Sequence, residues 1–376
     1  MDAALRSIKR VCYAGLDSVT LRREVAARTA RVVAFDAHAF STCDPDTGLM
    51  AHTLAEGVPL PLAKAYAERL YPEECARIVM DMPRKGAAVF SMLEQSPQVL
   101  DEFETAGLRF QAQVSLATGG RLWGTWCMMR TDRSPRTSAR GRTFLERIAP
   151  HVARGLRTAA LVDRAVTAAN RAGPSQAATS QGATAGDRRA ADGAPGILVL
   201  DAYYRPVVRT PLAGAWLDDL ADVGLRMPHG LPLSVFGLVS RLRSAHSDVA
   251  PDEVRVRARG ASGRWYVMRA SLAEPDATGE CAAVVVVRPA LPREVATILT
   301  RLYDLSDRER EVIAAIARGD STKAIAAALG VSPHTVAEHV ERACRKIGVR
   351  GRKALVAKLF VDGYAPRAAA APSATR

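Results

Sequence analysis

The stretch from Leu305 to Val349 constrains the fold of this 376-residue chain more than any other part. It holds three short apolar patterns at helical spacing, and each begins and ends at residues that start or stop helices. Ser306 with Glu309 three residues later is a capping box, and Ser332 followed by Pro333 starts a further helix. The three patterns end at Gly319, Gly330 and Gly348. Two helices joined by a short turn that contains glycine predict a helix-turn-helix.

Basic residues cluster in the third helical pattern and just after it. From residue 342 to residue 358 the chain carries seven lysine or arginine residues and no acidic residue. A helix that enters the DNA major groove needs such a cluster beside it to neutralise phosphates. The net charge of +13 also fits a nucleic-acid partner. A plain helical bundle is the alternative, but the basic cluster favours binding to double-stranded DNA.

Residues Leu305 to Leu359 resemble the C-terminal DNA-binding domain of LuxR-type regulators. The motifs that carry the resemblance are LSDREREV from Leu305, Lys323 to Ala326, Gly330 to Ser332, Thr335–Val336, His339 and Ile347 to Arg350. The resemblance implies that the helix starting near Ser332 reads the groove. It also implies that a last helix, about residues 352 to 361, supports a homodimer.

The expected DNA contacts fall into a groove-facing set and a phosphate-binding set. The groove-facing set is Val336, Ala337, Glu338 and Glu341. The phosphate-binding set is Lys323, Thr335, Arg345, Lys346 and Arg350, and Ser332 begins the reading helix. Ala337, Glu338 and Glu341 stand where the family often has lysine or asparagine, so its usual base contacts do not transfer. Glu338 either accepts a hydrogen bond from a cytosine amino group or is only solvated, and both alternatives stay open.

Residues 1–165 are predicted to form an α+β domain with an antiparallel sheet. The expected elements are a helix over about 5–34, hairpins around the turns at 44–48 and 118–120, and a helix over 142–164. Their order resembles a GAF-type sensory domain, in which a ligand lies between the sheet and the covering helices. Candidate residues of such a pocket are His52, Tyr66, Met92, Trp123 and Trp126. Ordinary core packing of these side chains is the alternative to an effector site.

Residues 196–290 are predicted to form a second α+β domain. A strand pair near 197–210, short helices and three strands over 254–287 resemble a PAS-type module. It shows no flavin-binding cysteine motif and no convincing haem histidine, so no cofactor is expected. Residues 166–195 are rich in small and polar residues and are predicted to be a flexible linker. A connecting helix over 291–303, a DNA-binding domain over 304–363 and a disordered tail over 364–376 complete the expected organisation.

Enzyme motifs are absent from the sequence: there is no phosphate-binding loop, zinc-protease helix or nucleophile elbow. The six cysteines are scattered and form no CxxC pair, so no metal site is predicted. The sequence contains no run of about 18 apolar residues, so no membrane span is predicted either. We therefore expect a multidomain cytoplasmic transcription regulator that is not an enzyme, with RNA polymerase as a candidate partner. The alternatives are a sigma-factor-like promoter-recognition protein and an enzyme with a GAF-like core.

Overall fold

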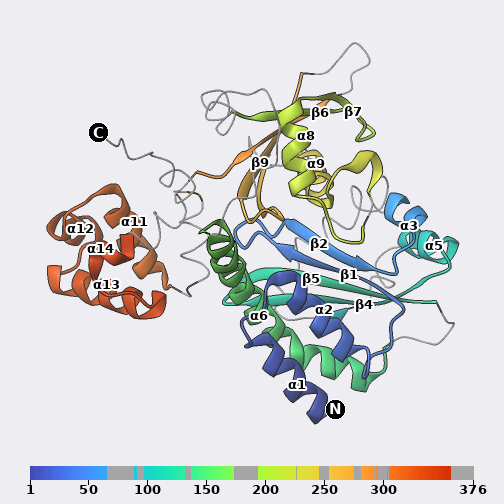
Figure 1. Cartoon of the computed structure of the whole chain (residues 1–376), viewed down its shortest axis with the longest axis horizontal. Helices are drawn as coiled ribbons and strands as arrows, with labels where there is room; N and C mark the ends of the chain where they lie inside the picture. Colours follow the sequence, from blue (N-terminus) through green and yellow to red (C-terminus); the bar gives the residue numbers. More distant parts are fainter. Residues whose placement is uncertain are drawn as a thin grey trace, which may run out of the picture. The chain divides into compact units, whose positions relative to one another are not determined.

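The computed structural model describes residues 1–65, 89–90, 97–131, 137–172, 194–225, 227–244, 254–274, 281–291, 294, 303 and 305–356 (Figure 1). The chain separates into two compact units, Met1–Pro289 and Ala290–Arg376. No described helix is long and apolar enough to cross a bilayer. Several predictions fall outside the described residues. They concern the pocket residues Tyr66 and Met92, most of the linker and of the connecting helix, and the C-terminal tail.

The first half of the Met1–Pro289 unit is built on a five-stranded sheet in the order β2-β1-β5-β4-β3, with every neighbouring pair antiparallel. Its strands are β1 (Ala37–Cys43), β2 (Met50–Glu56), β3 (Val89–Phe90), β4 (Arg109–Thr118) and β5 (Arg121–Arg130). Its helices are α1 (Asp2–Cys12), α2 (Ser18–Thr29), α3 (Leu60–Ala65), α5 (Pro97–Thr105) and α6 (Ala139–Ala172). The two predicted hairpins and the α+β character are thereby confirmed.

Helices α1, α2 and α6 pack together on one face of this sheet (Figure 1). The helix expected over 5–34 is wrong as a single element, because Gly15 adopts a left-handed φ of 70° and Asp17 then caps a new helix. Gly155 of α6 lies against α1, where an added Cβ would stand 3.2 Å from the Cβ of Cys12. The two helices therefore approach more closely than a larger residue at that position permits.

The second half of the unit is a five-stranded antiparallel sheet in the order β7-β6-β10-β9-β8. Its strands are β6 (Gly196–Leu200), β7 (Pro206–Arg209), β8 (Val254–Arg259), β9 (Trp265–Leu272) and β10 (Ala283–Pro289). Helices α8 (Pro211–Asp219) and α9 (Leu233–Ser244) and the 3-10 turn η4 (Pro228–Gly230) lie between β7 and β8 in the chain. The predicted strand pair, the short helices and the three later strands are all present.

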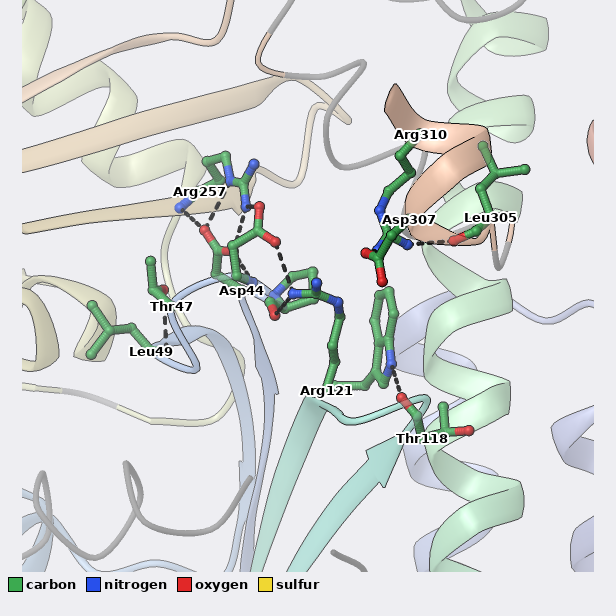
Figure 2. A network of polar contacts seen from close by, with 12 residues as sticks. Asp44, Thr47, Leu49, Thr118, Arg121, Arg257, Leu305, Asp307 and Arg310 are labelled. Atoms are coloured by element: carbon green, nitrogen blue, oxygen red, sulfur yellow. Dashed lines mark hydrogen bonds and ion pairs between the residues drawn. The ribbon is translucent and has the colours of Figure 1, made fainter. Parts of the chain in front are cut away.

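The two sheets share one set of buried apolar side chains, which includes residues of β1, β2 and β5 as well as of β6, β8 and β10. A buried ion pair crosses between them. Nη2 of Arg257 on β8 donates to Oδ1 of Asp44 at 2.7 Å, and its Nε donates to Oδ2 at 2.9 Å (Figure 2). Asp46 accepts a further hydrogen bond from Arg257 at 2.5 Å. Because both members of the pair are almost fully buried, they fix the β1–β2 turn against the second sheet.

A loop of the second half also pairs with the edge of the first sheet. The amide of Ala55 on β2 donates to the carbonyl of Val223 at 2.8 Å, and the amide of Val223 donates to the carbonyl of Thr53 at 2.9 Å. The Asp222 carboxylate accepts from the amides of Thr53 and Leu233 at 2.6 and 2.7 Å. This pairing covers part of an edge strand that would otherwise present unpaired backbone groups.

Candidate nucleic-acid interface

Four helices make up the described part of the Ala290–Arg376 unit: α11 (Asp307–Arg318), α12 (Thr322–Leu329), α13 (Pro333–Ile347) and α14 (Gly351–Val356). The predicted caps are confirmed, because Ser306 and Glu309 form a reciprocal capping box and the side chain of Ser332 accepts from the amide of Thr335. The glycines that follow α11, α12 and α13 all adopt left-handed φ, as predicted for helix-ending residues. Their tight turns place α12 and α13 as a helix-turn-helix.

The core of this small domain comes from one side of each helix. The buried apolar side chains are Leu305, Val312, Ile313, Ala315, Ile316, Ile325, Ala326, Val336, Ala343, Cys344, Ile347 and Leu355. Val336 was expected to face the groove, and that assignment is wrong because its side chain is only 1% exposed. It lies about one helical turn before Val340 and about two turns before Ala343 on the packed side of α13. Its β-branched side chain therefore stabilises the domain instead.

The opposite side of α13 faces solvent. Six residues at helical spacing form this exposed stripe: His334, Ala337, Glu338, Glu341, Arg342 and Arg345. Of these, His334 and Arg342 were missing from the predicted contacts. The helical period alone was enough to find them, because both lie within a turn of Glu338 on the same side. We name these six residues the α13 stripe.

Ion pairs within the α13 stripe link each glutamate to an arginine one turn later. Nη2 of Arg342 donates to Oε2 of Glu338 at 2.9 Å, and Nη2 of Arg345 donates to Oε1 of Glu341 at 3.3 Å. All four side chains are at least 45% exposed, so these pairs are weak and exchange readily with other partners. With neutral histidine the stripe has no net charge, and it presents both carboxylate acceptors and guanidinium donors.

The predicted phosphate contacts lie in two kinds of environment. Lys323 at the start of α12, Arg345 and Arg350 are exposed. Lys346 instead donates from Nζ to Oε2 of Glu309 on α11 at 2.7 Å. Burial alone would raise the pKa of Glu309, but the hydrogen bonds from Lys346 and from the Ser306 amide hold that pKa below its usual value. Lys346 therefore ties α13 to α11 in the free domain.

Ser332 and Thr335 serve the start of α13. The two hydroxyls lie 2.9 Å apart, and the Ser332 oxygen accepts from the Thr335 amide at 3.0 Å. Arg352 ties α14 to the turn before α12, because Nη2 donates to the carbonyl of Asp320 at 2.5 Å. These contacts fix the start of α13 and attach α14 to the turn before α12.

Three residues predicted to line a ligand pocket are described by the structure, and each contacts another residue of the protein. His52 accepts a hydrogen bond from Nη2 of Arg22 at 2.9 Å, and burial together with the Arg22 charge lowers its pKa to about 3. Trp126 is fully buried and stacks on Phe40 with ring centres 4.7 Å apart. Trp123 donates from its indole to the carbonyl of Thr118 at 3.3 Å. The described residues hold no cluster of three or more His, Cys, Asp or Glu side chains suited to a metal ion.

A capped helix-turn-helix with one solvent-facing polar stripe and basic flanks defines a DNA-binding domain of the helix-turn-helix class. The family model of bacterial regulatory proteins of the luxR family matches residues 304–359. The spore germination protein GerE of Bacillus subtilis is 42% identical over 59 residues, which are 16% of this chain and 80% of that protein. This chain therefore belongs to the luxR family.

Other relatives match over the same part of the chain. A probable transcriptional regulatory protein NarL of Mycobacterium tuberculosis is 56% identical over 54 residues, which are 14% of this chain. The match spans about a quarter of the length of NarL. The solved VqmA–ligand–DNA complex of Vibrio cholerae aligns at 17% identity over 49% of this chain and 90% of that chain. Its TM-score is 0.23, so its arrangement does not transfer to this chain.

Proposed function

We propose that this chain is a sequence-specific DNA-binding transcription regulator that acts as a homodimer. The observation that carries the proposal is the α13 stripe on a domain of the luxR family. A single α-helix fits the major groove, where base edges differ between all four base pairs. In this proposal the chain binds DNA and catalyses no reaction. It acts in the bacterial cytoplasm, with RNA polymerase as a partner in promoter control.

The Met1–Pro289 unit receives the signal or holds the dimer in this proposal. We assign a GAF-like character to its first sheet and a PAS-like character to its second sheet. The support is the order of their elements, two five-stranded antiparallel sheets with helices inserted between hairpins. A signal acts on DNA binding only if it favours one arrangement of the two DNA-binding domains over another.

Readout and affinity are divided between two sets of side chains on the DNA-binding domain. Glu338 and Glu341 accept hydrogen bonds, so they suit the amino group of cytosine and repel phosphates. Exposed Lys323, Arg345 and Arg350 suit phosphates, which carry no direct sequence information. In the free protein Arg345 already holds the carboxylate of Glu341, so DNA binding exchanges that weak pair for a phosphate.

The test uses the purified full chain and fragments selected from genomic DNA. Glu338→Ala is expected to change the preference between base pairs in the selected site by about tenfold. Arg345→Ala is expected to weaken all sequences alike and to reduce the slope of log affinity against log salt by about one. Both are measured by titration of labelled duplexes at several salt concentrations.

Arg308→Ala is the matched control, because Arg308 is an exposed arginine of the same domain that pairs with Glu311 on α11. It is expected to leave both preference and salt slope unchanged. If the folded full chain binds no DNA duplex at low salt, the proposed function is contradicted. Equal effects of Glu338→Ala on all sequences contradict the assignment of Glu338 to readout.

A further inference from the structure

A cavity of about 60 Å³ lies on the face of the first sheet opposite to α1, α2 and α6. Its floor comes from β1, β2, β4 and β5, and one wall comes from α3 and α5. Val58, between β2 and α3, and Leu225, Met227 and Leu233 of the second half form the rest of its lining. The cavity volume is about four times what a single water molecule needs. None of His52, Trp123 and Trp126, the described members of the predicted pocket, lines it.

Side-chain alternation explains why the predicted residues His52 and Trp126 lie on the other face of the sheet. His52 on β2 lies opposite Thr42 of β1, and Gly124 of β5 pairs with the same Thr42. An added Cβ on Gly124 would stand 2.7 Å from Leu156 of α6, so this face belongs to the helices. The neighbouring positions Ser41 and Thr125 point to the other face, where the cavity lies.

Two polar side chains in the cavity floor have no partner within the described part of the protein. Gln113 is 5% exposed and Thr125 is 3% exposed, and the structure records no side-chain hydrogen bond for either. Ser41 beside them is satisfied, because its hydroxyl lies 2.8 Å from that of Thr53. Buried polar groups are nearly always hydrogen-bonded, so an amide and a hydroxyl left open toward a cavity indicate a missing partner.

We propose that this cavity binds a small neutral organic molecule of about five non-hydrogen atoms, with a short apolar part and one polar group that hydrogen-bonds Gln113 and Thr125. The remaining lining is mostly aliphatic, aromatic or thioether, and no lining residue is charged. A charged ligand would lose its hydration there without a counter-ion. The proposal deepens the proposed function, because this ligand would be the signal received by the Met1–Pro289 unit.

The second sheet takes part in the site through the loop that contributes Leu225 and Met227. Asp222 holds that loop by accepting from the amide of Thr53 on β2 and from the amide of Leu233 at the start of α9. Val223 continues the attachment as a parallel bridge to Leu54. A ligand in the cavity therefore contacts segments of both halves of the unit, and its binding energy favours their packed arrangement.

The test uses the full chain with three probes of similar shape: propanamide, propanoate and 2-methylbutane. Propanamide is expected to bind saturably in ligand-observed NMR and to raise the midpoint of thermal unfolding, whereas propanoate does neither. Thr125→Val and Gln113→Leu are each expected to weaken propanamide about tenfold while leaving 2-methylbutane within twofold. Thr118→Val is the matched control, because it changes the same residue type on β4 outside the cavity and leaves all three probes unchanged.

Absence of saturable propanamide binding overturns the proposal, and so does an equal loss of propanamide and 2-methylbutane binding in the two floor variants. Ala63→Leu provides a second test, because a larger side chain on the α3 wall fills the cavity and is expected to abolish propanamide binding. Retained propanamide binding in that variant overturns the location of the site. The same preparations are titrated with DNA. If the wild type binds DNA but no probe, only the proposed ligand site is refuted. If the wild type does not bind DNA, the proposed function is refuted.

Discussion

Single buried residues set how the Met1–Pro289 unit responds to pH. His52 has a folded pKa of about 3, well below its ordinary value, because burial and then the Arg22 charge disfavour the imidazolium. As the pH falls below about 6.5, His52 of the unfolded chain binds a proton, whereas His52 of the folded protein stays neutral. The contribution of His52 to the unfolding free energy is therefore present above pH 6.5 and is lost as the pH falls below it.

Replacing His52 with glutamine is expected to remove that loss, since the amide oxygen still accepts from Arg22 but does not titrate. Between pH 7.5 and 5.0 the wild type is expected to lose about 2 kcal/mol more unfolding free energy than His52→Gln. Urea unfolding at the two pH values measures the difference. An NMR titration in which His52 protonates near pH 6.5 in the folded protein contradicts this account.

Asp222 changes the unfolding free energy with pH in the direction opposite to His52. The effect of His52 is therefore measured as the difference between His52→Gln and the wild type. Burial raises the pKa of Asp222 to about 6, although the amides of Leu233 and Thr53 pull it down. The folded protein then binds a proton between pH 6 and pH 4 that the unfolded chain does not, and stability rises as the pH falls through that window. This contribution is common to the wild type and His52→Gln, and it cancels in their difference.

At the scale of elements, close backbone approach decides how the loop after α8 attaches to β2. Gly224 has a φ of +71°, and an added Cβ would lie 2.0 Å from the carbonyl oxygen of Ala55. Gly230 in the same connection has a φ of +67°, but nothing lies within 4 Å of an added Cβ. The two glycines therefore have the same backbone requirement and differ only in the contact with β2.

Gly224→Ala is expected to destabilise the Met1–Pro289 unit by about 2 kcal/mol more than Gly230→Ala, because only the first forces the loop away from β2. Urea unfolding followed by tryptophan fluorescence measures both variants. Equal losses would show that positive φ alone accounts for the glycines and that the attachment to β2 is loose. Hydrogen exchange of the Ala55 amide, which is bonded to Val223, gives an independent reading of the same contact.

Local chemistry made some elements predictable from the sequence, and long-range packing hid the rest. The Ser306–Glu309 capping box and the helix-ending Gly348 act within one turn, so the helices of the DNA-binding domain were found. The break at Gly15 competes with an apolar pattern that continues on both sides, so one helix was expected where two exist. Alternation shows that two positions face opposite ways but not which face is covered. For that reason the cavity floor with Gln113 and Thr125 was missed.

At the scale of the whole molecule, one ion pair joins residues 213 positions apart and binds the two sheets into one unit. The Asp44 side chain is fully buried and that of Arg257 is 3% exposed. Such a pair is not a large source of stability by itself, because both charges have lost their hydration. Removing one partner is costly, since the other charge then remains buried and unpaired.

Arg257→Ala leaves Asp44 buried without its guanidinium partner. It is therefore expected to lower the unfolding free energy of the Met1–Pro289 unit by about 3 kcal/mol. Arg121→Ala is the matched control, because its side chain is 28% exposed and pairs with Asp46 at 3.1 Å, and its loss is expected to cost less than about 1 kcal/mol. The double variant Asp44→Leu with Arg257→Met is expected to recover most of the loss. Calorimetry of the full chain follows both units at once, and the transition of the Ala290–Arg376 unit should stay in place. A double variant as unstable as Arg257→Ala would show that the ion pair supplies stability through its geometry rather than by avoiding a buried unpaired charge.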